Sequence, residues 1–229
     1  PGKLGVIFPG QGAQFVGMLR DMACQFPEFQ DVLNAANHMF GTEFAQQRLS
    51  DLMYPQPVFS DAEREQQAAA LQTTQVAQPA IGAASLGAYH VLKTFGLAPD
   101  AVAGHSYGEL VALCVAGVLD IETFFAMSKL RGELMGQKHG DKGSMLAVNG
   151  DLKFVAEFIK NEKIDLVIAN KNAPLQIVLS GATSEVERAA SLLKARDIRC
   201  KQLSVAAAFH SSFVADASGA FLEALRRVT

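Results

Sequence analysis

The sequence has no excess of charge of either sign. Its 20 Lys and Arg residues are matched by 23 Asp and Glu, which gives a formal net charge of −3 with histidine neutral. Domains that bind DNA or RNA usually concentrate Lys and Arg on one surface. The charge balance therefore predicts no nucleic-acid partner.

Long apolar segments and cysteine pairs are also missing. The longest apolar run, from Leu110 to Leu119, is about half of the roughly 20 residues that span a bilayer, so we expect no membrane helix. The cysteines at 24, 114 and 200 form no CxxC pair and have no histidine at ligand spacing. This argues against structural zinc and a disulfide framework. We therefore expect a reducing, cytoplasmic location and no bound metal.

What the sequence does contain is typical of a globular α/β protein. Its 229 residues, 49% of them hydrophobic, suit one medium domain or one with a small insertion. Short β-branched runs alternate with segments of helical apolar spacing. We expect strands over 4–8 and 101–104, helices within 18–40 and over 74–95 and 109–117, and a loop over 51–60.

The pattern changes after residue 143, where short strands alternate with amphipathic helices. We expect strands over 144–148, 164–169, 176–180 and 198–203, and helices over 152–161 and 183–196. The resulting order, βαββαβ, is that of the split-βαβ, ferredoxin-like unit. We therefore predict a small subdomain over 144–204, inserted into a larger α/β subdomain formed by 1–143 and, after the chain returns, by 205–229.

The first candidate for chemistry is the GxSxG sequence from Gly104 to Gly108. Between a strand and a helix this pattern forces the serine, Ser106, onto a sharp turn with its hydroxyl exposed. The start of the following helix also offers the Tyr107 amide to a developing oxyanion. The structural alternative is a tight glycine turn with an inert serine.

A serine hydroxyl needs a base, and histidine has the suitable pKa. Of the five histidines, His38, His90 and His139 suit core or surface positions. His105 adjoins the serine but faces away from it in an elbow, so it suits a supporting role. His210 follows a small-residue run where the chain re-enters the large subdomain, and it remains the candidate base, with a satisfied, partly buried histidine as the alternative.

The loop after the first predicted strand, FPGQGAQ from Phe8 to Gln14, lacks the lysine of a P-loop and the spacing of a dinucleotide fold. It is therefore a poor phosphate cradle. Two glycines around Gln11 would let its amide approach a ligand closely, as a second oxyanion donor must. A plain turn is the alternative.

Five segments in this order resemble the motifs of malonyl-CoA:acyl-carrier-protein transacylases and of the acyltransferase domains of fatty acid and polyketide synthases. Within that family, the resemblance is closest to iterative synthases that make polyunsaturated fatty acids or enediyne-type polyketides. The motifs are FPGQGAQ (8–14), TQVAQPA (74–80), GHSYGE (104–109), KLRG (129–132) and AFHS (208–211).

The resemblance implies an α/β-hydrolase-like large subdomain with the βαββαβ unit inserted into it. It also implies Ser106 as nucleophile, His210 as base, the Gln11 and Tyr107 amides as the oxyanion hole, and Arg131 as the group that holds the substrate carboxylate. The reaction would be ping-pong transfer of malonyl from a CoA thioester, through an acyl-serine, to the phosphopantetheine thiol of an acyl carrier protein. No bound cofactor is implied.

Substrate choice centres on Arg131, whose planar, always charged guanidinium can hold a carboxylate bidentately. A surface helix arginine is the alternative. Phe209 matches the phenylalanine that the resemblance associates with malonyl over methylmalonyl, although Ala207 stands where malonyl-specific members often have histidine. His105 and Asn172 complete the expected substrate-binding set, and an Asx turn explains Asn172 equally well.

Partners and competing functions follow from the same residues. A multidomain synthase would supply neighbouring domains and an acidic carrier protein, which the basic residues Lys194, Arg196, Arg199 and Lys201 could meet. These residues could equally form a solvated surface.

Two other functions compete with the acyltransferase. One is a serine hydrolase or thioesterase, and the other is a docking domain that has lost activity.

Both ends of the sequence indicate a longer parent. The chain begins with Pro1 rather than Met, which suggests trimming or excision from a longer polypeptide. Family members continue beyond the position of Thr229. The resemblance therefore implies that the C-terminal part of the large subdomain is missing, together with the group that orients His210.

Overall fold

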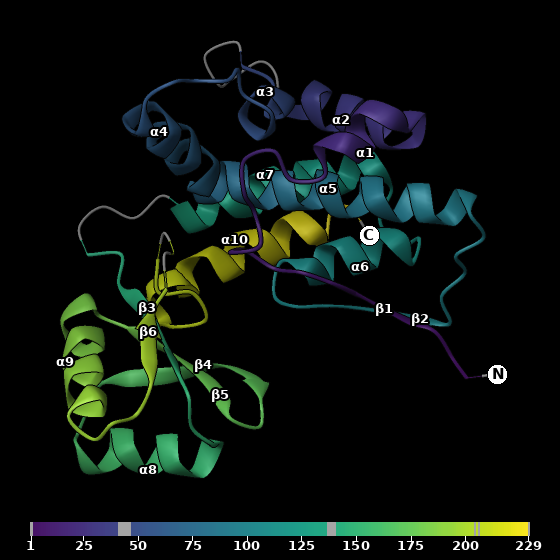
Figure 1. Cartoon of the computed structure of the whole chain (residues 1–229). Coiled ribbons are helices and arrows are strands. Elements are labelled where there is room, and N and C mark those ends of the chain that lie inside the picture. The colour runs from purple at the N-terminus through teal and green to yellow at the C-terminus, as the bar shows by residue number, and fades with distance from the viewer. Residues whose placement is uncertain (1, 41–46, 137–140, 204, 206, 229) are drawn as a thin grey trace. The chain divides into compact units, whose positions relative to one another are not determined.

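A computed structural model describes residues 2–40, 47–136, 141–203, 205 and 207–228 (Figure 1). The chain forms two compact units. The first comprises Pro1–Leu134 and Glu223–Thr229, and the second comprises Met135–Leu222. The predicted insertion, residues 144–204, lies within the second unit, and its exact bounds stay a prediction.

The first unit contains a short parallel sheet covered by helices. Strands β1 (Gly5–Phe8) and β2 (Ala101–Gly104) pair in register from Gly5↔Ala101 to Phe8↔Gly104. Because parallel strands end at the same edge, the loops after Phe8 and Gly104 emerge side by side. The helices are α1 (Arg20–Gln25), α2 (Pro27–Phe40), α3 (Leu49–Met53), α4 (Asp61–Gln72), α5 (Thr74–Thr94), α6 (Gly108–Val115) and α7 (Ile121–Gly136).

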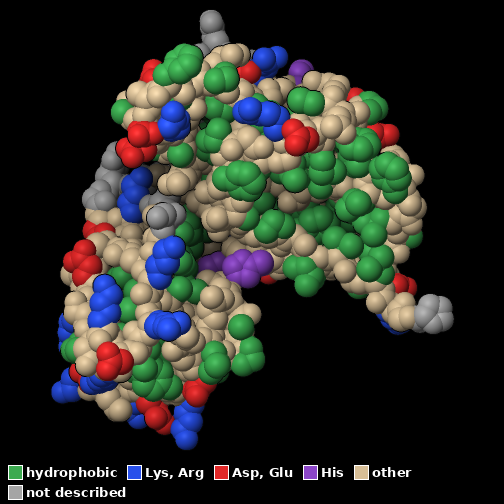
Figure 2. Space-filling model, viewed as in Figure 1, with side chains coloured by type: hydrophobic (Ala, Val, Ile, Leu, Met, Phe, Trp, Pro, Cys, Tyr) green, Lys and Arg blue, Asp and Glu red, His purple; other side chains and the backbone are tan. Residues whose placement is uncertain are grey.

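The long helix α5 is buried over most of its length because it is rich in Ala and Gly. A Cβ added at Gly87 would lie 2.7 Å from the ring of Phe29 on α2, so the missing side chain lets the two helices approach closely. Hydrophobic side chains also remain on the surface of this unit (Figure 2). Among them are Phe95 after α5 and Val118 after α6, 73% and 56% exposed.

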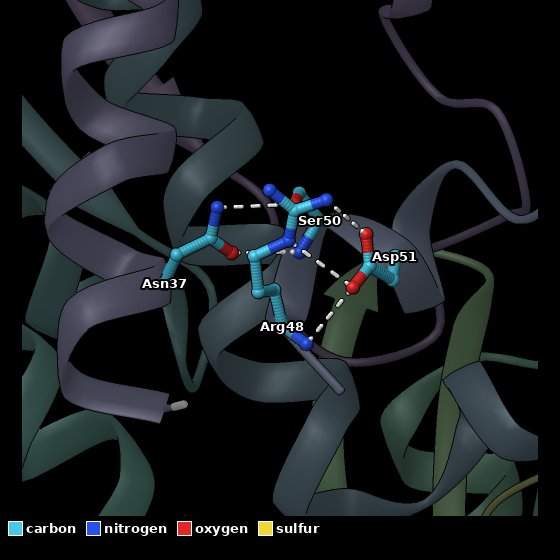
Figure 3. Close-up of polar contacts among 4 residues, drawn as sticks. All are labelled: Asn37, Arg48, Ser50 and Asp51. Atoms are coloured by element: carbon cyan, nitrogen blue, oxygen red, sulfur yellow. Dashed lines mark hydrogen bonds and ion pairs between the residues drawn. The ribbon is translucent and has the colours of Figure 1, made fainter. Parts of the chain in front are cut away.

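The predicted loop over 51–60 is partly wrong, because Asp51 to Met53 belong to α3. Polar contacts within two pairs of residues hold this short helix, as Figure 3 shows. Asn37 on α2 donates from Nδ2 to Ser50 Oγ (3.0 Å) and accepts from the Ser50 amide (2.9 Å). Arg48 forms an ion pair with Asp51 (2.8 Å) at the helix N-terminus. The contact with α2 is long-range, so apolar spacing does not reveal it.

Helix α4 is a further element that apolar periodicity does not indicate, because most of its side chains are polar or exposed. Its start has a capping box. The Glu63 amide donates to Ser60 Oγ (3.3 Å), and the Ser60 amide donates to the Glu63 carboxylate (3.2 Å). These bonds satisfy amide groups that the first helical turn leaves without partners.

The second unit contains a four-stranded antiparallel sheet in the order β4-β5-β3-β6. β5 lies between β3 and β4, which gives the predicted split-βαβ, ferredoxin-like arrangement. Its elements are β3 (Ser144–Val148), α8 (Leu152–Asn161), β4 (Leu166–Ala173), β5 (Gln176–Gly181), α9 (Thr183–Lys194), β6 (Cys200–Gln202), a 3-10 turn (Ser212–Val214) and α10 (Ala215–Leu225).

The two faces of this sheet pack differently. Leu146 and Val148 point toward α8 and α9 and join one core cluster. Met145, which alternates with them along β3, joins a smaller cluster with Val178 and Phe209 from the returning chain. The face opposite α8 and α9 therefore supports the turn that carries the candidate base.

Candidate active site

Ser106 lies between β2 and α6 with its backbone in the left-handed region, at φ 51°. A residue other than glycine rarely adopts this conformation, which costs free energy that the surroundings must offset. The flanking glycines are required for space. A Cβ on Gly104 would lie 1.9 Å from the carbonyl carbon of Gly108, and a Cβ on Gly108 would lie 2.2 Å from the Phe8 oxygen. The motif thus forms a strained strand-to-helix elbow.

The loop after β1 packs directly against this elbow. The His105 amide donates to the Phe8 oxygen (2.9 Å), and a Cβ on Gly10 would lie 2.5 Å from the His105 oxygen and 3.0 Å from its Nδ1. Within the described part of the chain, the backbone amides of Gln11 and Tyr107 make no hydrogen bond. Two amides beside one serine, at the carboxyl edge of a parallel sheet, are a suitable arrangement for binding a negatively charged oxygen.

The first turn of α5 holds the Gln11 side chain. Gln11 donates from Nε2 to Thr74 Oγ1 (3.4 Å) and accepts at Oε1 from Gln78 Nε2 (3.2 Å). Thr74 and Gln78 are four residues apart, so they lie on one face of the helix. Both are buried. This contact fixes the loop that packs against the elbow.

Arg131 reaches the elbow from α7. Its guanidinium carbon lies 6.0 Å from the centre of the Tyr107 ring, within the range of a cation–π interaction. A Cβ at Gly132, the next residue, would lie 2.8 Å from the Thr74 oxygen, so α7 packs tightly against the start of α5. The arginine is therefore held between the elbow and the helix that clamps Gln11.

Arg131 is half-buried, and no described carboxylate forms an ion pair with it. Desolvation lowers the pKa of its guanidinium, while the nearby Tyr107 and Glu109 raise it. An arginine stays protonated despite such a shift. Among the described residues its charge is therefore left available to the carboxylate of a bound substrate.

Other candidate groups fit catalysis less well. His38 and His90 are exposed on helices, and His139 lies outside the described residues. Cys114 follows the elbow on α6, where burial raises the pKa of its thiol to about 11. It is therefore protonated near neutral pH and is a poor nucleophile.

Three of the sequence-predicted residues belong to the second unit. His210 is exposed in a turn and has φ 59°, while Phe209 beside it is buried. Ser211 stabilises the turn by donating to the Ala208 oxygen (2.6 Å). Asn172 is exposed on β4, where the pairing with β5 shifts between Lys171 and Ala173. It lies in a strand, two residues before Pro174.

The structure thus brings together the predicted residues of the first unit, which are Gln11, His105, Ser106, Tyr107 and Arg131. Sequence reasoning gave no role to three buried residues that hold this group, which are Thr74, Gln78 and Ser128. Their spacing could have indicated them. Thr74 precedes Gln78 by four positions and Ser128 precedes Arg131 by three, which places each pair on one helix face.

The predicted basic cluster is divided between the two faces of the small sheet. Arg196 forms an ion pair with Glu162 and lies over the Phe158 ring, on the helix side. Cys200 also points to that side, where it donates to the Ala190 oxygen. By alternation, Arg199 and Lys201 face the opposite side, where they line a hollow of about 480 Å³.

Two further findings concern only the described residues. They contain no group of three or more His, Cys, Asp or Glu side chains that could hold a metal ion. No helix among them has the length and apolar character needed to cross a bilayer.

The fold and the elbow together define an α/β protein that carries a serine on a strand-to-helix turn beside two available amides. The model of the acyl transferase domain matches residues 6–229. The chain therefore belongs to the acyl transferase domain family, as the sequence motifs predicted.

Known proteins similar to the chain include large synthases and malonyl CoA-acyl carrier protein transacylases. It is 31% identical to a polyunsaturated fatty acid synthase of Thraustochytrium sp., over all of the chain and 8% of that protein. It is 34% identical to a malonyl CoA-acyl carrier protein transacylase of Bacillus subtilis, over 97% of the chain and 68% of that protein. The chain thus spans a small part of the first relative and about two thirds of the second.

Among solved structures, one is a type II polyketide synthase acyl carrier protein in complex with its malonyl-transacylase. It matches 99% of the chain and 71% of that structure's chain, with a TM-score of 0.85 and 31% identity. This likeness confirms the predicted mixed α/β fold class with a small antiparallel sheet.

Proposed function

We propose that this chain is an acyltransferase that moves a malonyl group from malonyl-CoA to the phosphopantetheine thiol of an acyl carrier protein. The observation that carries the proposal is the strained Ser106 elbow beside the available amides of Gln11 and Tyr107. The Bacillus relative and the complex of a transacylase with a carrier protein, each described by its name, support this choice of substrate and partner.

In the first half-reaction, His210 takes the proton from Ser106 Oγ as that oxygen attacks the thioester carbonyl. The Gln11 and Tyr107 amides bind the resulting oxyanion. The carbon–sulfur bond then breaks, the CoA thiolate takes the proton back from His210, and malonyl remains as an ester on Ser106. In the second half-reaction, the carrier thiol gives its proton to His210 and attacks the ester carbonyl. The ester carbon–oxygen bond then breaks, and Ser106 Oγ takes the proton back from His210, which regenerates the serine.

Arg131 selects the substrate in this proposal by pairing with the free carboxylate of malonyl, which acetyl lacks. A half-buried guanidinium that has no internal carboxylate partner among the described residues suits this role. Phe209 restricts space for a branched acyl group. His105 packs on Gly10 and holds the loop of Gln11, and Asn172 completes the substrate-binding set.

The same proposal covers the setting of the reaction. The acidic carrier protein contacts the hollow beside Arg199 and Lys201, where two cations face the same side of the sheet. The neighbouring domains are those of a multidomain synthase, and the location is cytoplasmic. The reaction uses the chain's own side chains and amides, without a bound cofactor.

Incubation with malonyl-CoA, followed by intact-mass measurement, tests the proposal. We expect a stable malonyl increment on Ser106 that moves to an added holo carrier protein. Ser106→Ala should abolish the increment, whereas Ser184→Ala, which changes an exposed serine on α9, should keep it. Rapid release of free malonate would instead identify a hydrolase, and neither increment nor release would identify a docking domain.

A further inference from the structure

The side chain of Tyr107 is buried behind the elbow that its amide helps to form. Tyr107 and Ser128 on α7 are both 0% exposed, and their hydroxyl oxygens lie 2.8 Å apart in a hydrogen bond. Burial raises the pKa of the Tyr107 phenol, so the hydroxyl keeps its proton. A buried hydroxyl without a partner is costly. This bond therefore fixes the position of α7 relative to the elbow.

The fold makes space for this hydroxyl pair. A Cβ at Gly82 on α5 would lie 2.3 Å from the Tyr107 oxygen and 2.7 Å from Cζ of Phe124. The glycine is thus needed for space, since a side chain there would displace the tyrosine. Three helices, α5, α6 and α7, meet around one phenol.

The same tyrosine also supports the arginine. Ser128 and Arg131 are three residues apart on α7, so they lie on one face about a turn apart. The first contacts the Tyr107 hydroxyl, and the second lies over its ring. Because both contacts involve one side chain, movement of the ring would change the place of the guanidinium.

We propose that the hydrogen bond between Tyr107 and Ser128 positions Arg131 for the substrate carboxylate, and so sets the preference for malonyl over acetyl. The inference rests on the proposed function. Both residues are positioning residues, because their side chains act on the arginine rather than on the substrate. Tyr107 thus serves two parts of the site, its amide at the oxyanion and its ring under the carboxylate-binding group.

The main test measures kcat/KM for acylation of Ser106 by malonyl-CoA and by acetyl-CoA in the full chain. Ser128→Ala and Tyr107→Phe should each lower the malonyl-to-acetyl ratio by about tenfold, the size of a lost buried hydrogen bond, mainly through a higher KM for malonyl-CoA. Ser128→Thr keeps a hydroxyl and should recover most of the ratio. Because Ser128→Ala and Tyr107→Phe each remove the same hydrogen bond, the test still works if one of the two variants misfolds.

Combination with Arg131→Ala distinguishes positioning from general support of the fold. If the hydrogen bond acts through the arginine, Ser128→Ala should lower the ratio no further once Arg131 is removed. A further drop in that background would overturn the proposal. So would an unchanged ratio in both single variants, or equal losses with the two donors.

A second readout does not depend on activity. Phenylglyoxal modifies accessible arginines, and peptide mass spectrometry follows each site. We expect Arg131 to be modified at least about threefold faster in Ser128→Ala than in the wild type, with the exposed Arg199 unchanged; equal rates at Arg131 would contradict the positioning role. If malonyl-CoA fails to acylate the wild type, the proposed function fails, and this measurement still decides the inference.

Discussion

Replacing Arg131 by alanine separates a malonyl-selective transferase from an enzyme that accepts any acyl thioester. The substitution removes the guanidinium above the Tyr107 ring and leaves the elbow in place. Malonyl-CoA would lose a charge-assisted and bidentate contact. Acetyl-CoA would lose nothing, because its acyl group has no carboxylate to make this contact. We therefore expect Ser106 to be acylated more slowly by malonyl-CoA and at an unchanged rate by acetyl-CoA.

The structure narrows the size of this loss. Truncating one partner of a desolvated ion pair typically costs about 2 to 5 kcal/mol. Because Arg131 is only half-buried, solvent screens part of the interaction, and we expect the lower half of that range. A loss of about 2 to 3 kcal/mol corresponds to a roughly 30- to 150-fold decrease in malonyl acylation.

The assay is the rate of Ser106 acylation by each donor, followed by intact mass. Arg131→Lys should recover little, because an ammonium keeps the charge and loses the planar fork. Arg64→Ala, which removes an exposed arginine on α4, is the matched control and should leave both rates unchanged. Equal losses for malonyl and acetyl in Arg131→Ala would refute the reasoning, because the arginine would then only support the fold.

Three further predictions concern the base, the elbow and the buried thiol. His210→Ala should slow acylation by roughly 10²- to 10⁴-fold, the usual effect of losing a general base; an unaltered pH–rate profile would reject the assignment. Gly104→Ala places a Cβ 1.9 Å from backbone and should lower the free energy of unfolding by about 1 to 3 kcal/mol. Gly5→Ala meets nothing within 4 Å and is its control in denaturant melts, where equal midpoints would contradict the steric argument. Below its raised pKa, the Cys114 thiol is mostly protonated, and only the thiolate reacts with iodoacetamide. Labelling of Cys114 should therefore be slow at pH 8 and become faster as the pH rises toward about 11. The exposed Cys24 should react readily at pH 8, and equal rates for the two thiols there would disprove the shift.

Local sequence signals predicted the helices and strands that depend on residues close to one another along the chain. The βαββαβ order follows from periodicity and caps within short windows, and it reappears as β3 to β6 with α8 and α9. Helices α3, α4, α7 and α10 were not predicted, and the first two of these lack such a signal. Helix α4 has few buried residues, and α3 depends on Asn37, which contacts Ser50 across 13 positions.

For the site, the sequence by itself determined the sharp turn at Ser106, because two glycines and a strand-to-helix context restrict the backbone locally. Only the tertiary structure decided what surrounds it. The clamp on Gln11 comes from side chains 63 and 67 positions away, and Tyr107 meets Ser128 across 21. Such contacts depend on how helices pack, and packing is decided by side-chain shape and missing side chains, as at Gly82, rather than by spacing along the chain.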